Sequence, residues 1–321
     1  MNIMEYLKSF SSHTDYEEYV TGGTMVRPNV SYCEDVKDVH YNPIIPHDYS
    51  QDYFATVALE NGTITFTPTE SNAISYSTDN GNTWVEGNSV NVVNGDKVLW
   101  KGTMTPLGLE GIGVFYETTC NFDVKGNVMS LIYGDDFKNQ LSLEGKHDCF
   151  YFLLGESSVV NAKDLVLPAT TLADSCYHEM FGMCRRLTSA PQLPATTLAN
   201  FCYSSMFVNC IHLTTAPQLP VTTLAEGCYN YMFNECTSLT TAPELPATTL
   251  VDYCYEGMFQ GCTSLNYIKA MFTTTPSLTY TGDWVDGVAV SGTFVKNSVA
   301  TWDVSGVNGV PNGWTVETAS E

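Results

Sequence analysis

The sequence predicts a mixed, multidomain fold in which an antiparallel β-sandwich is followed by an α/β solenoid of 26-residue repeats. Two observations lead to this prediction. From Leu167 onward one 26-residue unit is written four times, and a fixed period of this length is typical of a solenoid. Between residues 53 and 145, short alternating apolar runs are separated by Asn-Gly and similar turn signals, which is typical of antiparallel strands.

Composition limits the classes of partner. The chain has 321 residues, 44% of them hydrophobic, and a formal net charge of −22. This charge would repel a phosphate backbone or an anionic leaflet, so we expect no nucleic-acid partner and no membrane partner. No run reaches the roughly 18 apolar residues that span a bilayer. The N-terminus lacks the basic and apolar regions of a secretion signal, as expected for a chain that is not exported.

Residues 1–50 are predicted to be an irregular and helical N-terminal docking segment. Residues 3–20 carry apolar positions at helical spacing, and the proline-containing stretch that follows should be extended. Such a segment needs a surface to become ordered, either the chain's own next domain or another subunit, and both alternatives stay open. The histidine spacings match no metal site, and we expect no metal and no cofactor. The candidate docking residues are Phe10, His13, Tyr16, Tyr19, Pro28, Asn29, Tyr32, His40 and Tyr41.

Residues 51–145 are predicted to form the β-sandwich, of immunoglobulin-like type. Within it, Ser77, Asp79, Gly81 and Trp84 in STDNGNTW match the pattern of the Asp box, which resembles the hairpins of sialidase-type propeller blades. We expect a hairpin in which Asp79 closes the turn, Gly81 has a positive φ and Trp84 folds back over it. A sialidase would need several copies of this motif, so the motif is interpreted as structural.

Residues 146–265 are predicted to form the solenoid, with a degenerate first turn before the four repeats. The positions that stay constant between copies fill one half of a helical wheel at 100° per residue, which predicts a helix over about 173–184 of each copy. The LTTAP-type segments should be short parallel strands. Residues 266–321 should form a small β-rich C-terminal cap. In the first copy the constant residues are Leu172, Cys176, Tyr177, Met180, Phe181, Cys184 and Leu187.

Eight of the eleven cysteines recur once per copy, in two rows that start at Cys176 and Cys184. The two cysteines of one copy are eight residues apart, which is neither C-x-x-C spacing nor a usual zinc arrangement. We interpret both rows as small buried hydrophobic residues, with disulfides or metal ligands as the alternative.

The repeat core C-Y-x-x-M-F-x-x-C-x-x-L, preceded by LP-x-x-x-x-L, resembles the leucine-rich repeat of the BspA (Treponema) type. The resemblance implies a leucine-rich-repeat solenoid that serves as an adhesin or interaction scaffold. The order of motifs, from F-S-S-H-x-x-Y-x-x-Y at Phe10 to PNGWTV at Pro311, resembles fibre and decoration proteins in virions of Bacteroides-infecting crAss-like phages. That resemblance implies docking on other virion proteins through residues 1–50, and a virion location after assembly in the host cytoplasm.

We therefore expect a non-enzymatic phage virion structural protein, a head or tail fibre or decoration, that attaches to a host-surface glycan or protein. The alternative is a bacterial cell-surface adhesin of BspA type. Paired carboxylates, Ser/His/Asp groupings and phosphate-binding loops are not evident, so no catalytic residue is predicted. Fibres are commonly homotrimers, although no heptad enforces this. The candidate ligand-facing side chains, for which the alternative is that they only keep the surface soluble, are His178, Arg185, Arg186, Phe201, His212, Tyr231 and Tyr253.

Overall fold

The computed structural model of the protein describes residues 48–69, 74–106 and 111–319. The chain divides into two compact units, Met1–Pro46 and His47–Glu321, and every described residue belongs to the second unit. Outside the described residues lie all of the predicted docking residues, which are Phe10, His13, Tyr16, Tyr19, Pro28, Asn29, Tyr32, His40 and Tyr41.

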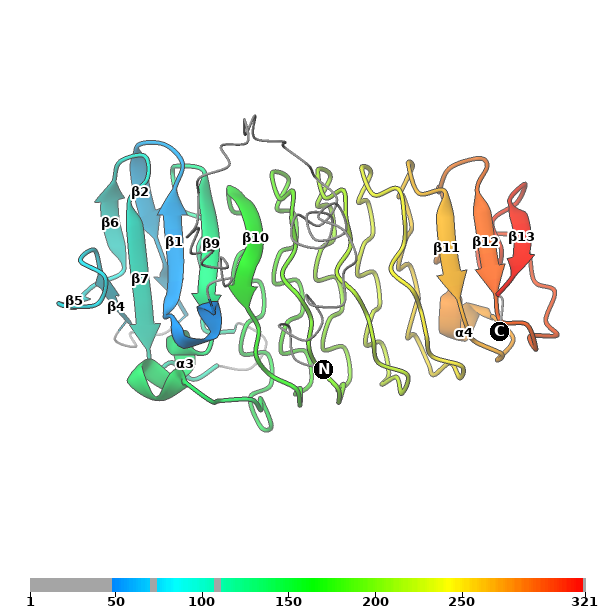
Figure 1. Ribbon diagram of the computed structural model, residues 1–321, viewed down its shortest axis with the longest axis horizontal. Coiled ribbons are helices and arrows are strands. Elements are labelled where there is room, and N and C mark those ends of the chain that lie inside the picture. The colour runs from blue at the N-terminus through cyan, green and yellow to red at the C-terminus, as the bar shows by residue number, and fades with distance from the viewer. Residues whose placement is uncertain (1–47, 70–73, 107–110, 320–321) are drawn as a thin grey trace, which may run out of the picture. The chain divides into compact units, whose positions relative to one another are not determined.

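A mixed six-stranded sheet with the order β10-β9-β1-β7-β4-β5 forms the first part of this unit (Figure 1). Two-stranded pairs β2-β6 and β3-β8 accompany it, together with three short helices, η1, α3 and η3. The strands are β1 (Phe54–Ala58), β2 (Gly62–Thr65), β3 (Thr67–Pro68), β4 (Ile74–Ser77), β5 (Val85–Glu86), β6 (Ser89–Val92), β7 (Lys97–Gly102), β8 (Gly113–Val114), β9 (Phe122–Asn127) and β10 (Val159–Val166). The helices are η1 (Tyr49–Gln51), α3 (Ser130–Tyr133) and η3 (Gly134–Phe137).

The predicted immunoglobulin-like antiparallel sandwich is therefore wrong. Several small sheets form in its place, and the largest of them is not purely antiparallel, because β10 pairs with β9 in parallel. β10 lies beyond residue 145, where the predicted sandwich ends. Since β10 also bridges to the first repeat, at Asn161 and Ser189, this sheet continues directly into the repeats.

The repeats form a stack of coils built from turns, with no helix over residues 173–184 or the equivalent residues of later copies. The backbone N–H of Tyr177 donates to the carbonyl of Cys202 in the next copy (3.0 Å), whereas the N–H of Met180 bonds back to the carbonyl of Tyr177 (3.2 Å). Amides thus alternate between the neighbouring copy and their own turn. The predicted α/β leucine-rich-repeat solenoid is wrong, because its helices are absent from the part of the chain that the structure describes.

The helix prediction is wrong because the apolar residues recur every four residues, whereas an α-helix has 3.6 residues per turn. Apolar pairs such as Cys176-Tyr177 recur every four residues, and over twelve residues a helical wheel barely separates the two periods. Ser175, Glu179 and Met183 have φ values of 52°, 50° and 59°, a left-handed conformation that a right-handed helix excludes. The same conformation recurs in the later copies at Phe201, Ser205, Asn209, Gly227, Tyr231, Glu235, Tyr253, Gly257 and Gly261.

The parallel strands predicted for the LTTAP segments are reduced to isolated bridges, such as Asn161 with Ser189 and Thr241 with Tyr267. Each of these segments ends in a proline and a second proline follows three residues later, as Pro191 and Pro194 do where the first copy joins the second, and proline has no N–H for a strand ladder. The corresponding stretch at the end of the fourth copy, NYIKAMF, has no proline and does form a strand. The missing amide donors therefore explain why regular strands return only there.

That strand is β11 (Tyr267–Ala270), the first of a parallel three-stranded sheet with β12 (Thr293–Lys296) and β13 (Thr315–Thr318). Figure 1 shows this sheet continuing the row of coils, with the short α4 (Leu278–Thr281) beside it. The backbone of the fourth copy also bonds forward into this region, for example from Phe259 N–H to the carbonyl of Trp284 (2.8 Å).

Two rows of stacked rings fill the interior of the stack. Neighbouring rings lie 5.6–6.0 Å apart in the row Phe150, Tyr177, Tyr203, Tyr229, Tyr255, and 5.4–5.9 Å apart in the row Phe181, Phe207, Phe233, Phe259. Trp284 contacts the last ring of both rows.

The eight repeat cysteines are buried and free, which confirms the prediction that they act as small core residues. The second cysteine of each copy donates a hydrogen bond from its thiol to a backbone carbonyl of the preceding coil, as Cys236 does to the carbonyl of Phe207 (3.1 Å).

Candidate ligand-binding surface

The positions at which the four copies differ lie mostly on the outer surface of the stack, which also carries constant threonines such as Thr196 and Thr197. The constant side chains of the interior, such as Cys176, Tyr177 and Phe181, are completely buried. The non-glycine residues with a left-handed backbone conformation are not completely buried. Ser175, Glu179 and their non-glycine equivalents in the later copies are half-buried or exposed. A ligand that binds over these variable positions would therefore meet side chains that the scaffold leaves free to change.

The three aromatic residues predicted to face a ligand differ in how open they are. Phe201 covers Gly227 of the next copy, since a Cβ on that glycine would lie 2.2 Å from the Phe201 Cε1. Tyr231 covers Gly257 in the same way, also at 2.2 Å from its Cε1. Tyr253 is 41% exposed. Phe201 and Tyr231 therefore have a packing role, and only Tyr253 presents a largely free ring.

Both predicted histidines have partners inside the protein. The ring of His178 lies edge-on to Tyr151, with centroids 5.3 Å apart, and its Nε2 is 3.4 Å from a carboxylate oxygen of Glu179. His212 is exposed, yet its Nδ1 donates to the backbone carbonyl of Arg185 in the preceding copy. These contacts account for both side chains without a ligand.

Arg185 and Arg186 are the predicted residues that lack such partners. Both are exposed, at the corner that follows Cys184, and neither forms an ion pair with any residue in the described ranges. They border a hollow of about 360 Å³ where the segment before β10 meets the first repeat. Its other lining residues are Glu156, Ser157, Ser158 and Met183.

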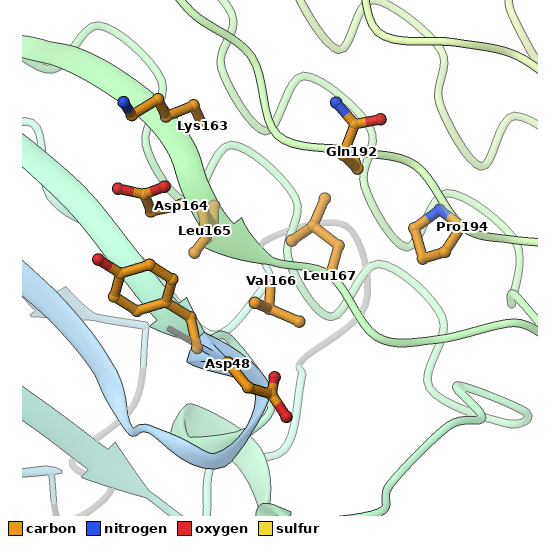
Figure 2. A pocket seen from close by; sticks show the side chains of 9 residues that line it. Asp48, Lys163, Asp164, Leu165, Val166, Leu167, Gln192 and Pro194 are labelled. Atoms are coloured by element: carbon orange, nitrogen blue, oxygen red, sulfur yellow. The ribbon is translucent and has the colours of Figure 1, made fainter. Parts of the chain in front are cut away.

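A second hollow, of about 270 Å³, was not predicted from the sequence (Figure 2). Its side chains come from η1, from β10 and from the segment that connects the first and second repeats, and no motif links these three segments. The ammonium group of Lys163 is accompanied by two carboxylates, so the hollow offers little to an anion. The lining residues are Asp48, Tyr49, Lys163, Asp164, Leu165, Val166, Leu167, Gln192 and Pro194.

The Asp-box hairpin forms between β4 and β5 as predicted. Thr83 donates to the Asp79 carboxylate through its amide (2.9 Å) and its hydroxyl (2.7 Å), and Ser77 adds a third hydrogen bond (2.8 Å). These bonds, the Thr83 amide first, hold the pKa of Asp79 at about 2. Gly81 has a φ of 87°, and a Cβ at this position would lie 3.9 Å from the ring of Trp84, which closes over the turn. The carboxylate is fully used in the turn, so the motif is structural.

One polar network on the sheet was missed because its members are far apart in the sequence. The Tyr53 hydroxyl donates to Asp135 (2.6 Å), and Lys101 Nζ forms an ion pair with the same carboxylate (2.7 Å). Burial and this carboxylate raise the pKa of Tyr53 to about 12, while the hydrogen bonds from Lys101 and Tyr53 lower the pKa of Asp135. Lys101 also lies 4.3 Å from the centroid of the Trp84 ring. The Tyr53 hydroxyl and the Lys101 ammonium group both bond to the Asp135 carboxylate, which indicates that this network has a structural role.

The interior offers little reactivity. Burial raises the pKa of the Cys184 and Cys202 thiols to about 12, so both stay protonated and weakly nucleophilic at neutral pH. Within the described ranges, no three His, Cys, Asp or Glu side chains are placed to share a metal ion, and no helix has the length and apolarity of a membrane span. Comparisons with family models, with curated proteins and with solved structures gave no match.

Proposed function

We propose that this chain is a non-enzymatic virion structural protein, a head or tail fibre or decoration, whose coils present an attachment surface to a host glycan or protein. One observation carries the attachment role. The four copies repeat the side chains that build the interior and vary almost only those that face outward. A scaffold of this kind can hold many different surfaces, as a binding protein requires.

The virion role rests on the motif order of the sequence, with docking through residues 1–50 and assembly in the host cytoplasm. Antibodies raised against the full chain should label purified phage particles in electron micrographs. A chain without residues 1–45 should remain folded but be missing from particles. Particles that carry the shortened chain would rule out docking through this segment.

The same antibodies distinguish the alternative, a bacterial cell-surface adhesin. In that case, the chain would be recovered from the envelope of uninfected cells and particles would remain unlabelled. Added in excess, the purified chain should also compete with its parent particle or cell for the host surface. Absence of competition would contradict the attachment role and leave a spacer role.

A further inference from the structure

We propose that Arg185 and Arg186 bind the carboxylate of an acidic sugar in the hollow that they share with Glu156, Ser158 and Met183. This inference rests on the proposed attachment function and names the ligand class for one part of the surface.

The first argument is charge. The chain contains only three arginines, Arg27, Arg185 and Arg186, against 35 acidic residues. Two of the three are adjacent, exposed and without an ion pair in the described ranges, although Lys101 and Lys269 do pair with carboxylates. Two neighbouring guanidinium groups repel each other, and a bound anion relieves that repulsion. The planar fork of arginine also matches a carboxylate with two parallel hydrogen bonds.

The second argument is that the stack does not need these arginines. At the same two positions, the later copies carry Ile211-His212, Thr237-Ser238 and Thr263-Ser264. His212 and Ser238 each bond to a carbonyl of the preceding copy, whereas the Arg186 side chain forms no hydrogen bond to the described residues. The corner therefore tolerates small hydroxyl residues, and the arginine pair has a role outside the scaffold.

The third argument selects a sugar acid from among anions. A polyanion would be repelled by the net charge of −22, whereas a single carboxylate on an otherwise neutral molecule is screened beyond about 8 Å at physiological salt. The hollow also contains the Ser158 hydroxyl and the Glu156 carboxylate, both of which can accept hydrogen bonds from sugar hydroxyls. Met183 adds an apolar surface for the C–H face of a ring.

The test is a calorimetric titration of the full chain with 3′-sialyllactose and with methyl glucuronide, using lactose and inorganic sulfate as controls. At least one acidic sugar should bind at least about tenfold more tightly than either control. In ¹⁵N–¹H spectra, the Nε–Hε signals of Arg185 and Arg186 should shift, while that of Arg27 provides an internal reference.

The matched variant is Arg185→Thr with Arg186→Ser, which copies the residues of the third and fourth repeats. It should weaken binding at least about tenfold and leave the unfolding midpoint unchanged. The proposal is overturned if neither acidic sugar binds at about 10 mM, if sulfate binds as tightly, or if the variant binds normally. These outcomes are independent of whether particles carry the chain, so failure of the ligand class and failure of the virion role can be told apart.

Discussion

Replacing Tyr203 by phenylalanine should make the protein more stable. Tyr177 and Tyr203 are buried in the ring row, and among the described residues neither hydroxyl has a hydrogen-bond partner. The row itself contains a precedent, because the coil before the first repeat places Phe150 in the same stack, 5.6 Å from Tyr177 and nearly parallel to it.

The magnitude follows from the desolvation of the hydroxyl. In the unfolded chain the hydroxyl is hydrated, and burying it without a partner costs about 1–3 kcal/mol. Removing the oxygen leaves the ring, which stacks on Tyr177 at 5.6 Å and on Tyr229 at 6.0 Å. We therefore expect Tyr203→Phe to raise the free energy of unfolding by about 1–3 kcal/mol. Because the two rings are in contact, the gain from adding Tyr177→Phe need not be additive.

The assay is chemical denaturation in guanidinium chloride, followed by circular dichroism, with the slope of the transition fitted for each variant. An unchanged slope with a higher midpoint means that stability alone has changed. Tyr53→Phe is the control of opposite sign, since its hydroxyl donates to Asp135 at 2.6 Å and its removal should lower the midpoint. If Tyr203→Phe lowers the midpoint as Tyr53→Phe does, the Tyr203 hydroxyl has a partner and the reasoning is refuted.

Three further predictions concern the coils and the hairpin. Gly257→Ala should lower the free energy of unfolding by about 1–3 kcal/mol, because its new Cβ would lie 2.2 Å from the Tyr231 ring. The control is Gly145→Ala, at a glycine that also has a positive φ but has no atom near the new Cβ. It should lower the free energy of unfolding clearly less in the same denaturation assay. The turn closed by Asp79 should be stable at neutral pH and should lose stability as the pH falls from the ordinary pKa of 3.8 towards 2, because the pKa of Asp79 is depressed in the folded protein. Amide hydrogen exchange in the turn measures this loss. Asp79→Asn should abolish the pH dependence. Deleting residues 193–218, one whole copy, should leave a folded protein by circular dichroism, whereas deleting half a copy should not.

Much of the interior can be predicted from the sequence because the copies report which positions are constrained. Cys176, Tyr177, Phe181 and their equivalents are predicted correctly as core residues. The type of local structure cannot be predicted in this way, because apolar pairs spaced by four also fill one half of a helical wheel. What decides between a helix and a turn is whether alternate amides find carbonyls in the next copy, as Tyr177 finds Cys202, and that is a tertiary property.

The candidate site can be predicted only in part, for a similar reason. Variation between copies identifies Arg185 and Arg186 as outward-facing, and the structure agrees. Their neighbours Glu156 and Ser158 belong to the segment before β10, where the repeat pattern has already been lost. Nothing in their local sequence connects them with the arginines; the stacking of this segment on the first repeat, in which the Glu156 amide donates to the Gly182 carbonyl (2.8 Å), brings the four residues together.

The position of the arginine pair within the stack bears on how well it can bind. Left-handed residues such as Glu179 and Met183 cost about 1–2 kcal/mol each, a cost that contacts with neighbouring coils must offset. The first repeat has such contacts on both sides. Thr188 donates its amide to Val160 of β10 (2.8 Å), and Met183 donates its amide to Val208 of the second copy (2.7 Å). The corner that carries the arginines is thereby fixed at both of its ends, so little backbone order remains to be gained on binding, and a small rigid ligand can be held without closure of the site.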